Sequence, residues 1–508
     1  MSIRLSRRLL LAGAAGLPFA PRLACAARQP GTLTFGLSSY PPNLSPWANT
    51  GTAALTVKIQ IHRGLLSFGP DAQVRGELAE SWTRDGDHAW VFKLRPATFH
   101  SGAPVTSADV QWSIGQIAGE KSTAYLRGQL QDIQAIETPD AATVRIVAKA
   151  PMVTLPLLLA SPFAFVLAKG STEGGSQPVG CGPYTITAQE RGVAIELAAF
   201  GKFYKPGKPK LNTIRFVAYP DENLRVAALQ AGDVDIIEYV PWQAMAAIAA
   251  DKKLKLSTTD GPYMALNFNG ATGPFKEEKL RSAVAFAIKR EEVVQAAFYG
   301  RGTPLEGLPI PKVSEFYNEK YAHAWTYDPE HAKHLMAEAG VANGFSCTLL
   351  STAQYGMHKA TAEVVQQHLA KIGMNVTLNL PDWPTRVTLG NRGQYEMCVQ
   401  GQAADNNDPD GLSSYIDGEL PPDNSRSFGV RTPRIHELLA LGRAEFDPVK
   451  RRAIYDEIQR LVVEQVPLVG LCWRAQGYAM ATDVAGFTNL PGGLNFYSGY
   501  SLEDVAFA

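Results

Sequence analysis

Strand-like and helix-like segments alternate along most of this 508-residue chain. Residues 211–239 read "LNTIRFVAYPDENLRVAALQAGDVDIIEY", which is typical of a strand, a helix that begins near Asp221, and a second strand. The alternation returns in residues 263–381, where "YMALNFN", "SCTLLST" and "NVTLNLP" are strand-like and "EKLRSAVAFAIKREEVVQAAF" and "KATAEVVQQHLAKIG" are helix-like. This order of elements predicts an α/β fold, in which helices cover a sheet.

The chain is too long for one hydrophobic core, because single cores stop growing beyond roughly 250–300 residues. We therefore expect two or more domains. Residues 82–106, "WTRDGDHAWVFKLRPATFHSGAPVT", interrupt the strand and helix alternation with hairpin-like runs that Asp85-Gly86 and Ser101-Gly102 divide. Two α/β lobes with a hairpin-rich block inserted early in the chain account for both patterns.

The N-terminus has the features of an export signal. Three arginines in the first eight residues precede the short apolar stretch "LLLAGAAGLPFA", and "ACA" then offers small residues for cleavage. The run "SRRLLL", followed by a Gly- and Ala-rich stretch and Arg22, is typical of a twin-arginine signal. Residues 1–26 are thus predicted to direct the chain to the periplasm and to be removed. Lipid attachment at Cys25 is the less favoured alternative, because Arg22 stands where an aliphatic residue is expected.

The charge balance of the mature chain argues against a nucleic-acid partner. Removal of residues 1–26 takes away four arginines and no acid, so that 48 − 48 becomes 44 − 48, a formal charge of −4. There are no runs of basic residues to hold phosphates. No other segment approaches the roughly 18 uninterrupted apolar residues of a membrane-spanning helix. We expect a periplasmic protein without a membrane span.

An acidic stretch at residues 406–417, "NNDPDGLSSYID", nearly matches a calcium loop. Asn406, Asp408, Asp410, Gly411 and Asp417 fall on positions 1, 3, 5, 6 and 12 of the EF-hand pattern. Three features disagree with it: an amide at position 1, a proline at position 4 and the shorter acid at position 12. The preceding residues also read as a strand, where an EF-hand has a helix. Turn chemistry is therefore the favoured interpretation, and calcium binding stays an alternative.

A second candidate metal site is His331, His334 and Glu338, which share one face of a predicted helix. Zinc sites need three or four ligands, whereas the face opposite an apolar stripe is where polar residues belong. No zinc-protease, nucleophile-elbow or nucleotide-binding glycine motif is present in the sequence. We expect no metal, no cofactor and no catalysis.

The four cysteines outside the predicted signal give two further hypotheses. Cys181 would be a nucleophile if the fold brought a histidine base near it, as in an extracytoplasmic hydrolase. A small buried thiol is the alternative that we favour. Cys347 and Cys398 lie in strand-like runs of one region and would be able to form a disulfide in an oxidising compartment.

Several segments carry a family likeness. They are residues 78–114, 178–184 ("PVGCGPY"), 227–236 ("AALQAGDVDI"), 265–294 and 327–340 ("YDPEHAKHLMAEAG"). With them the chain resembles the extracytoplasmic solute-binding proteins of ABC importers, family 5, the dipeptide-, oligopeptide-, opine- and nickel-binding group. In "VGCGPY", Gly180 and Gly182 predict a tight turn that Pro183 fixes.

The resemblance implies a two-lobed, hinged periplasmic-binding-protein fold, type II-like, with an additional inserted subdomain. It assigns residues 27–61, 165–262 and 476–508 to the first lobe, 62–164 to the inserted subdomain and 263–475 to the second lobe. The chain would cross the hinge near "GPYMALNFN" and "LCWRAQGYAM". Such a protein captures a short peptide or peptide-like small solute between its lobes and delivers it, as a monomer, to permease subunits. An opine or a nickel chelate is the alternative ligand.

Asp405 is the first candidate ligand-binding residue. The stretch "GQAAD" resembles the place in peptide-binding members where an aspartate pairs with the ligand's α-ammonium group, and Gly401 would let an extended ligand approach the strand edge. Gln402 and Asn406 depart from the family pattern, which usually has tryptophan and tyrosine at these positions. The departure puts peptide preference in question, although not the family.

Six further residues are candidates for the ligand site. Trp383, in "LPDWPTRV", matches a tryptophan that lines side-chain pockets in oligopeptide binders. The nearby Arg386 would form a carboxylate clamp, and Arg392 is a second candidate for it. By alignment with the family, Tyr40, Tyr125 and Trp473 are also placed at the ligand.

Overall fold

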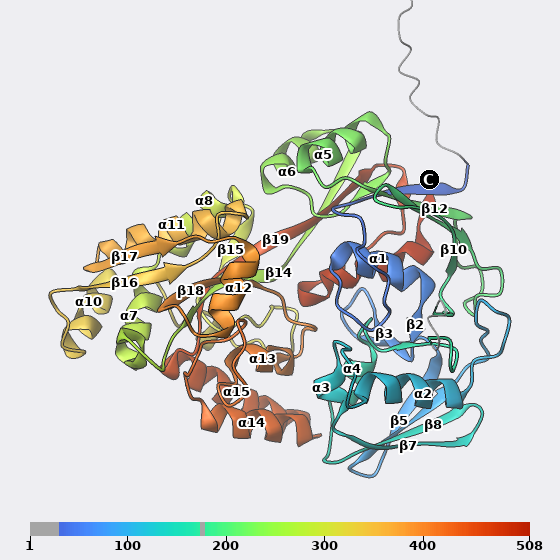
Figure 1. The fold of residues 1–508 in the computed structure, drawn as a ribbon, viewed down its shortest axis with the longest axis horizontal. Helices are drawn as coiled ribbons and strands as arrows, with labels where there is room; N and C mark the ends of the chain where they lie inside the picture. Colours follow the sequence, from blue (N-terminus) through green and yellow to red (C-terminus); the bar gives the residue numbers. More distant parts are fainter. Residues whose placement is uncertain (1–29, 173–177) are drawn as a thin grey trace, which may run out of the picture.

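The computed structural model describes residues 30–172 and 178–508, so the predicted export signal and Cys25 lie outside the described residues. It is a two-lobed α/β protein whose lobes share one mixed sheet (Figure 1). The strands of that sheet, in spatial order, are β10 (Tyr184–Glu190), β11 (Ala194–Ala199), β12 (Thr213–Ala218), β1 (Thr32–Leu37), β13 (Ile236–Ile237), β19 (Val469–Ala481), β14 (Leu254–Phe268), β18 (Met397–Gln402), β16 (Phe345–Leu350) and β17 (Met374–Asn379), with β15 (Gly302–Pro304) beside β19.

Two long antiparallel strands connect the lobes. β14 has 15 residues and β19 has 13, and they pair from Leu254 with Ala481 to Leu266 with Val469. In Figure 1 both strands run from the first-lobe side of the molecule into the second lobe. The two predicted hinge segments lie within these strands, so the backbone that joins the lobes is a hydrogen-bonded ribbon rather than a loose linker.

The predicted strand, helix and strand of residues 211–239 are confirmed as β12, α5 (Glu222–Ala231) and β13. Asp221 caps α5, because its Oδ1 accepts a hydrogen bond of 2.9 Å from the backbone N–H of Leu224. The helix ends at Gly232, which adopts φ 80° in the left-handed region that glycine tolerates. β1 pairs in parallel with both β12 and β13, as expected of strands joined through helices.

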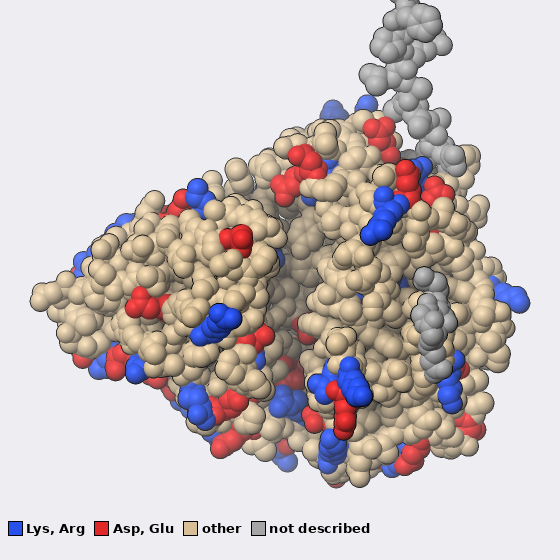
Figure 2. All heavy atoms as spheres, viewed as in Figure 1, with Lys and Arg blue, Asp and Glu red and all other residues tan. Residues whose placement is uncertain are grey.

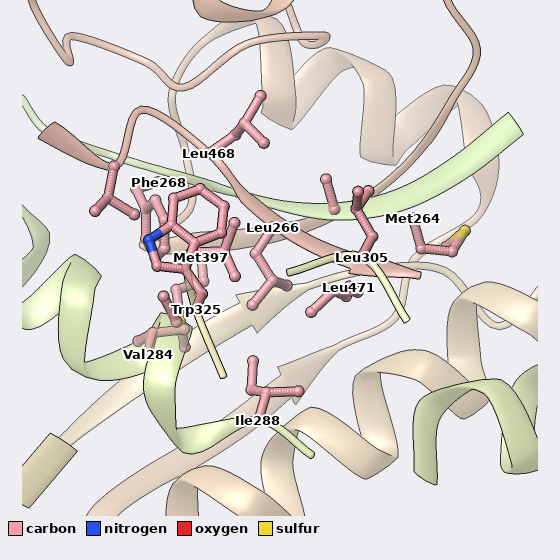
Figure 3. Close-up of a cluster of buried hydrophobic side chains, with 14 of the residues drawn as sticks. Met264, Leu266, Phe268, Val284, Ile288, Leu305, Trp325, Met397, Leu468 and Leu471 are labelled. Atoms are coloured by element: carbon pink, nitrogen blue, oxygen red, sulfur yellow. The ribbon is translucent and has the colours of Figure 1, made fainter. Parts of the chain in front are cut away.

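The second lobe is built on β14, β18, β16 and β17 and has the largest hydrophobic core. Figure 3 shows part of it, with Leu266, Trp325 and Met397 pointing toward one another between the sheet and its helices. The helices of this lobe are α7 (Glu278–Ala287), α8 (Arg290–Phe298), α9 (Glu319–Ala322), α10 (Pro329–Glu338), α11 (Gly356–Ala370), α12 (Trp383–Asn391), α13 (Ser413–Ile416), α14 (Pro433–Ala444) and α15 (Pro448–Gln465).

The hairpin-rich block forms a separate four-stranded antiparallel sheet in the order β5 (Ala79–Asp85), β6 (Ala89–Leu94), β8 (Thr143–Ala148), β7 (Ile133–Asp140). It lies at the lower right of Figure 1, under the first lobe. Besides α5, the helices of the block and the first lobe are α1 (Thr52–Ile61), α2 (Ser107–Ala118), α3 (Arg127–Leu130), α4 (Leu155–Leu159) and α6 (Met245–Ala250). Short strand pairs complete the fold: β2 (Arg63–Gly64) with β9 (Phe165–Val166), β3 (Leu66–Phe68) with β4 (Val74–Gly76), and β20 (Val484–Ala485) with β21 (Ala506–Phe507).

The glycines of "VGCGPY" serve close packing rather than the tight turn that the sequence predicted. Neither glycine has a φ in the left-handed region. A Cβ added to Gly182 would lie 2.3 Å from the carbonyl oxygen of Gln60, and one on Gly180 would lie 2.1 Å from that of Ile61. The segment thus crosses the end of α1 at backbone contact distance, where only glycine fits.

Gly182→Ala is expected to destabilise the protein by at least about 2 kcal/mol, because the contacting atoms belong to the backbone of α1 and cannot rotate away. Urea denaturation followed by circular dichroism would measure the loss. Gly115→Ala is the matched control: Gly115 lies in α2 with nothing near its missing Cβ, so alanine should stabilise by about 0.5–1 kcal/mol. Equal stabilities of the two variants would contradict the packing role of Gly182.

Candidate ligand-binding cleft

A groove separates the second lobe from the first lobe and its subdomain (Figure 2). It contains two adjoining chambers. The Asp405 chamber, of about 350 Å³, is lined by Asp405 and Tyr125, and the His358 chamber, of about 1010 Å³, is lined by His358. Both chambers are bounded by residues from the two lobes and from β19, which connects them: Gly51, Tyr239, Trp383, Gly401 and Arg474.

Asp405 is held by a contact across the cleft. The Tyr125 hydroxyl, from the inserted block, donates a hydrogen bond of 2.7 Å to Asp405 Oδ1, which follows the end of β18 in the second lobe. Burial raises the pKa of Asp405, whereas the bond from Tyr125 lowers it. Tyr415 fixes the same segment from behind by donating to the carbonyl oxygen of Ala403 at 2.9 Å. The carboxylate therefore faces a partly desolvated cavity in which a cation would be a strong partner.

Gly401 lies on β18 opposite Met264 and borders both chambers. A Cβ there would come within 3.1 Å of His358 Nε2 and 3.3 Å of Met264 Sδ. The glycine thus leaves room for the imidazole that lines the neighbouring chamber. Gln402, one of the departures from the family pattern, accepts a hydrogen bond of 3.0 Å from the Tyr263 hydroxyl and donates to the carbonyl oxygen of Ser425. It ties β18 to the loop that closes this side of the cavity.

Trp383 begins α12, whose first turn is capped by Asp382. Its ring borders both chambers and contacts the rings of Tyr355 and His358 with centroids 5.3 and 5.5 Å apart. The Arg386 guanidinium stacks against the tryptophan ring at 4.7 Å. The indole is therefore a wall of the cleft that is supported on several sides.

Arg386 does not line either chamber, which corrects the prediction that it clamps a ligand carboxylate. Its side chain is completely buried and donates to the carbonyl oxygen of Val399 at 2.6 Å. From there it supports Trp383 from behind. Arg392, the second candidate, is exposed at the end of α12 and borders neither chamber.

Tyr40 and Trp473 also lie away from the two chambers. Tyr40 borders a separate cavity of about 680 Å³ on the first lobe, together with Pro41 and His62. Trp473 borders a cavity of about 560 Å³ beside β15. Because successive side chains of a strand point to opposite faces, the next residue of β19, Arg474, points into the cleft.

Three cleft residues were missed in the sequence: Tyr239, His358 and Arg474. Tyr239 adopts φ 49°, a left-handed conformation that is strained for tyrosine, and stacks on Phe496. Burial, together with Arg386 and Arg474, lowers the pKa of His358 to about 3, so this imidazole is neutral. The only sequence feature that could have indicated one of these residues was the position of Arg474, a charged residue beside Trp473 in the predicted hinge segment.

The acids of this stretch contact arginine and histidine side chains, which explains them without calcium. Arg451 contacts both oxygens of Asp408, at 2.7 and 2.9 Å. Arg443 contacts Asp410 at 3.0 Å, and His436 contacts Asp417 at 2.8 Å. The described part of the chain contains no group of three or more His, Cys, Asp or Glu residues arranged to hold a metal ion.

The second candidate metal group is likewise occupied by ion pairs. His334 contacts Glu338 at 2.9 Å, and Lys279 contacts the same glutamate at 2.8 Å. His331 instead packs against the Phe286 ring with centroids 4.6 Å apart. These side chains belong to the polar face of α10, which was the alternative interpretation of the pattern.

The disulfide hypothesis is wrong in this structure, because Cys347 and Cys398 are both free. Each is buried, in β16 and β18 respectively, and Cys398 receives a hydrogen bond from Arg386 at 3.4 Å. Cys181 is also buried, and burial raises the pKa of its thiol to about 12. A thiol with that pKa is protonated at neutral pH and is a poor nucleophile.

Comparison with known proteins gives the family. Residues 73–421 match the model for bacterial extracellular solute-binding proteins, family 5, so the chain belongs to that family. Its members are extracytoplasmic substrate-binding components of ABC importers, which work with permease subunits and are not enzymes. The hydrolase alternative is therefore set aside. No helix in the described ranges is long and apolar enough to cross a membrane.

Particular relatives include proteins with opine and peptide ligands. The chain is 40% identical to the periplasmic binding protein AgaA from A. tumefacien R10, solved with agropinic acid, with a TM-score of 0.83 over 94% of this chain and 99% of that one. It is 27% identical to the glutathione-binding protein GsiB of Salmonella choleraesuis (strain SC-B67), over 91% of this chain and 92% of the relative. The Helicobacter pylori protein DppA with peptide STSA shares the fold at 21% identity, with a TM-score of 0.79 and coverage of 94% and 98%.

Proposed function

We propose that this protein captures an opine-like amino compound or a short peptide in the cleft between its lobes and presents it to an ABC permease. The observation that carries the proposal is the Asp405 carboxylate, which borders the chamber between the lobes and is met across it by Tyr125. The 40% identity to a protein solved with agropinic acid favours the opine over the peptide.

In this proposal the lobes have the boundaries predicted from the sequence, and closure brings Tyr125 and Asp405 together over the ligand. Gly401 gives the ligand access to the edge of β18, and Trp383 supplies an aromatic wall. A ligand that contacts both lobes favours the closed arrangement by its differential affinity for it. The mature protein begins after a cleaved twin-arginine-like signal, residues 1–26, and acts in the periplasm, with a lipid anchor at Cys25 as the lesser alternative.

Thermal unfolding of the mature protein with candidate solutes would test the ligand class. The panel consists of agropinic acid, glutathione, a mixture of short peptides and histidine-chelated nickel. A ligand at 100 times its dissociation constant should stabilise the folded protein by about 2.7 kcal/mol. We expect the opine or peptide members to raise the unfolding temperature. Stabilisation by the nickel chelate alone would contradict the proposal.

Asp405→Asn is expected to weaken a ligand that carries an ammonium group by more than about tenfold, because a charge-assisted hydrogen bond contributes roughly 1.5–3 kcal/mol. The asparagine oxygen still accepts the bond from Tyr125, so the variant removes the charge and keeps the contact between the lobes. Titration calorimetry would measure the affinity. Tyr125→Phe is the control for loss of the contact alone. Equal affinity of Asp405→Asn and the unaltered protein for a cationic ligand would refute this role.

A further inference from the structure

Arg474 is a buried cation that faces the cleft from the hinge strand. Its side chain, 7% exposed, borders both the Asp405 chamber and the His358 chamber. It lies on β19, one of the two strands that connect the lobes, so its backbone position is fixed by the pairing with β14 and β15. A charge at this place lies within reach of a molecule that occupies either chamber.

The guanidinium of Arg474 has no oxygen partner among the described residues. Its Nη1 lies 3.2 Å from Met357 Sδ, a weak acceptor, and its Nε is buried without a partner. No carboxylate of a described residue comes within 4.0 Å of its nitrogens, although Asp405 borders the same chamber. An unsatisfied buried donor of this kind is costly for the folded protein and is rare in native structures.

The other buried arginines of the described residues differ from it. Each donates to at least one oxygen: Arg63 to Glu503, Arg225 to Tyr219, Arg281 to Phe275, Arg290 to Leu305, Arg386 to Val399 and Arg451 to Asp408. Arginine burial in this protein is therefore accompanied by oxygen acceptors, and the exception is the one arginine that borders both chambers. The missing acceptor is expected to come from a ligand.

His358 supports the same position. It is 2% exposed, borders the larger chamber that Arg474 also borders, and has a buried Nδ1 without a partner. With a neutral ring it has one N–H to donate. The chamber thus offers a guanidinium fork and a neutral imidazole, a combination that suits the two oxygens of a carboxylate.

We propose that Arg474 anchors a carboxylate of the transported solute, and that the solute is therefore an amino-acid derivative with a free carboxyl group. The inference deepens the proposed function and rests on it. Because Asp405 lines the same chamber as Arg474, the cleft selects solutes that carry a cationic or hydrogen-bond-donating group and a carboxylate. The larger chamber accommodates the remainder of the molecule.

The first arm of the test needs no ligand. Arg474→Met keeps the length of the side chain and removes the unsatisfied donor, so the ligand-free variant is expected to unfold at the same temperature as the unaltered protein or higher. A clear fall in the unfolding temperature would show that the guanidinium has a structural partner. That result would overturn the proposal.

The second arm measures affinity for agropinic acid, glutathione and trialanine, each beside its carboxamide, by titration calorimetry. We expect Arg474→Met to bind the acids more than about tenfold more weakly than the unaltered protein does, and the amides about equally, since only the acids form the bidentate bond. Arg474→Lys should fall between them, because lysine keeps the charge and loses the fork. Arg392→Met, an exposed arginine outside the cleft, should change nothing.

The outcomes separate the two proposals. Unaltered binding of the acids by Arg474→Met, or equal affinity of the native protein for acids and amides, contradicts the anchor and leaves the proposed function standing. A native protein that binds no member of the panel contradicts the proposed ligand class and the anchor with it.

Discussion

Arg63→Met is expected to destabilise the protein by about 3–5 kcal/mol, the usual effect of breaking a buried ion pair by removing one partner. Arg63 is completely buried and contacts Glu503 at 2.8 Å and Glu77 at 3.3 Å. Lys205 bridges the same two carboxylates at 2.8 Å each. Without Arg63, the cations that remain beside the two buried carboxylates are Lys205 and Lys208, which are both partly exposed. Urea denaturation would give the loss.

The destabilisation expected for Arg63→Met should depend on pH in a defined direction. Burial raises the pKa of Glu503, but Arg63 and Lys205 more than offset it and lower the pKa to about 2. The stabilisation is therefore present above the ordinary value of 4.5 and is lost as the pH falls toward 2. In Arg63→Met the carboxylates protonate more readily, so the difference between variant and native protein should shrink over this pH range.

The matched control is Arg145→Met in the same subdomain. Arg145 contacts Asp85 at 2.7 Å and Glu137 at 3.1 Å, but all three side chains are partly exposed. Exposed pairs contribute about 0–1 kcal/mol, so the control should lose no more than that. A loss for Arg63→Met as small as that of the control would mean that water or the lysines compensate the buried acids. Arg63 would then add little to the contact between the subdomain and Glu503 in the C-terminal segment.

The sequence was sufficient for the fold, and it singled out two residues of one motif that the structure places at the cleft. The helix after Asp221 and the strands on either side of it follow from local patterns that the structure keeps. Asp405 and Gly401 border the cleft because they lie just after and near the end of β18. Trp383 borders it because it opens α12, the helix that follows β17.

The remaining cleft residues could not be predicted from the sequence, because their positions depend on which face of a helix or strand meets the other lobe. Trp473 and Arg474 are neighbours, yet the pleat of β19 sends them to different cavities. Arg386 would have reached the ligand from another face of α12, but its turn places it under Trp383. Composition and motif spacing do not determine these orientations, which are set by the pairing of β14 with β19 and the packing between lobes.

Arg451→Met is expected to cost about 3–5 kcal/mol as well, and to weaken solute binding in addition. Arg451 is 6% exposed, holds Asp408 through two hydrogen bonds, and lies against the rings of Phe316 and Tyr455. Asp408 follows Asp405 by three residues and caps the short helix at Pro409–Leu412. Loss of the arginine therefore releases the segment that aims Asp405 into the cleft. Urea denaturation and calorimetry on the same samples would measure both effects.

Replacing Asp408 as well as Arg451 distinguishes an ion pair from a calcium loop. Asp408→Asn added to Arg451→Met removes the uncompensated charge, so the double variant should regain part of the lost stability. A calcium loop would behave in the opposite way: removing a ligating carboxylate would destabilise it further, and EDTA would lower the stability of the native protein. Because Arg451 and Arg443 already pair with Asp408 and Asp410, and His436 contacts Asp417, EDTA and added calcium should both leave the native unfolding temperature unchanged.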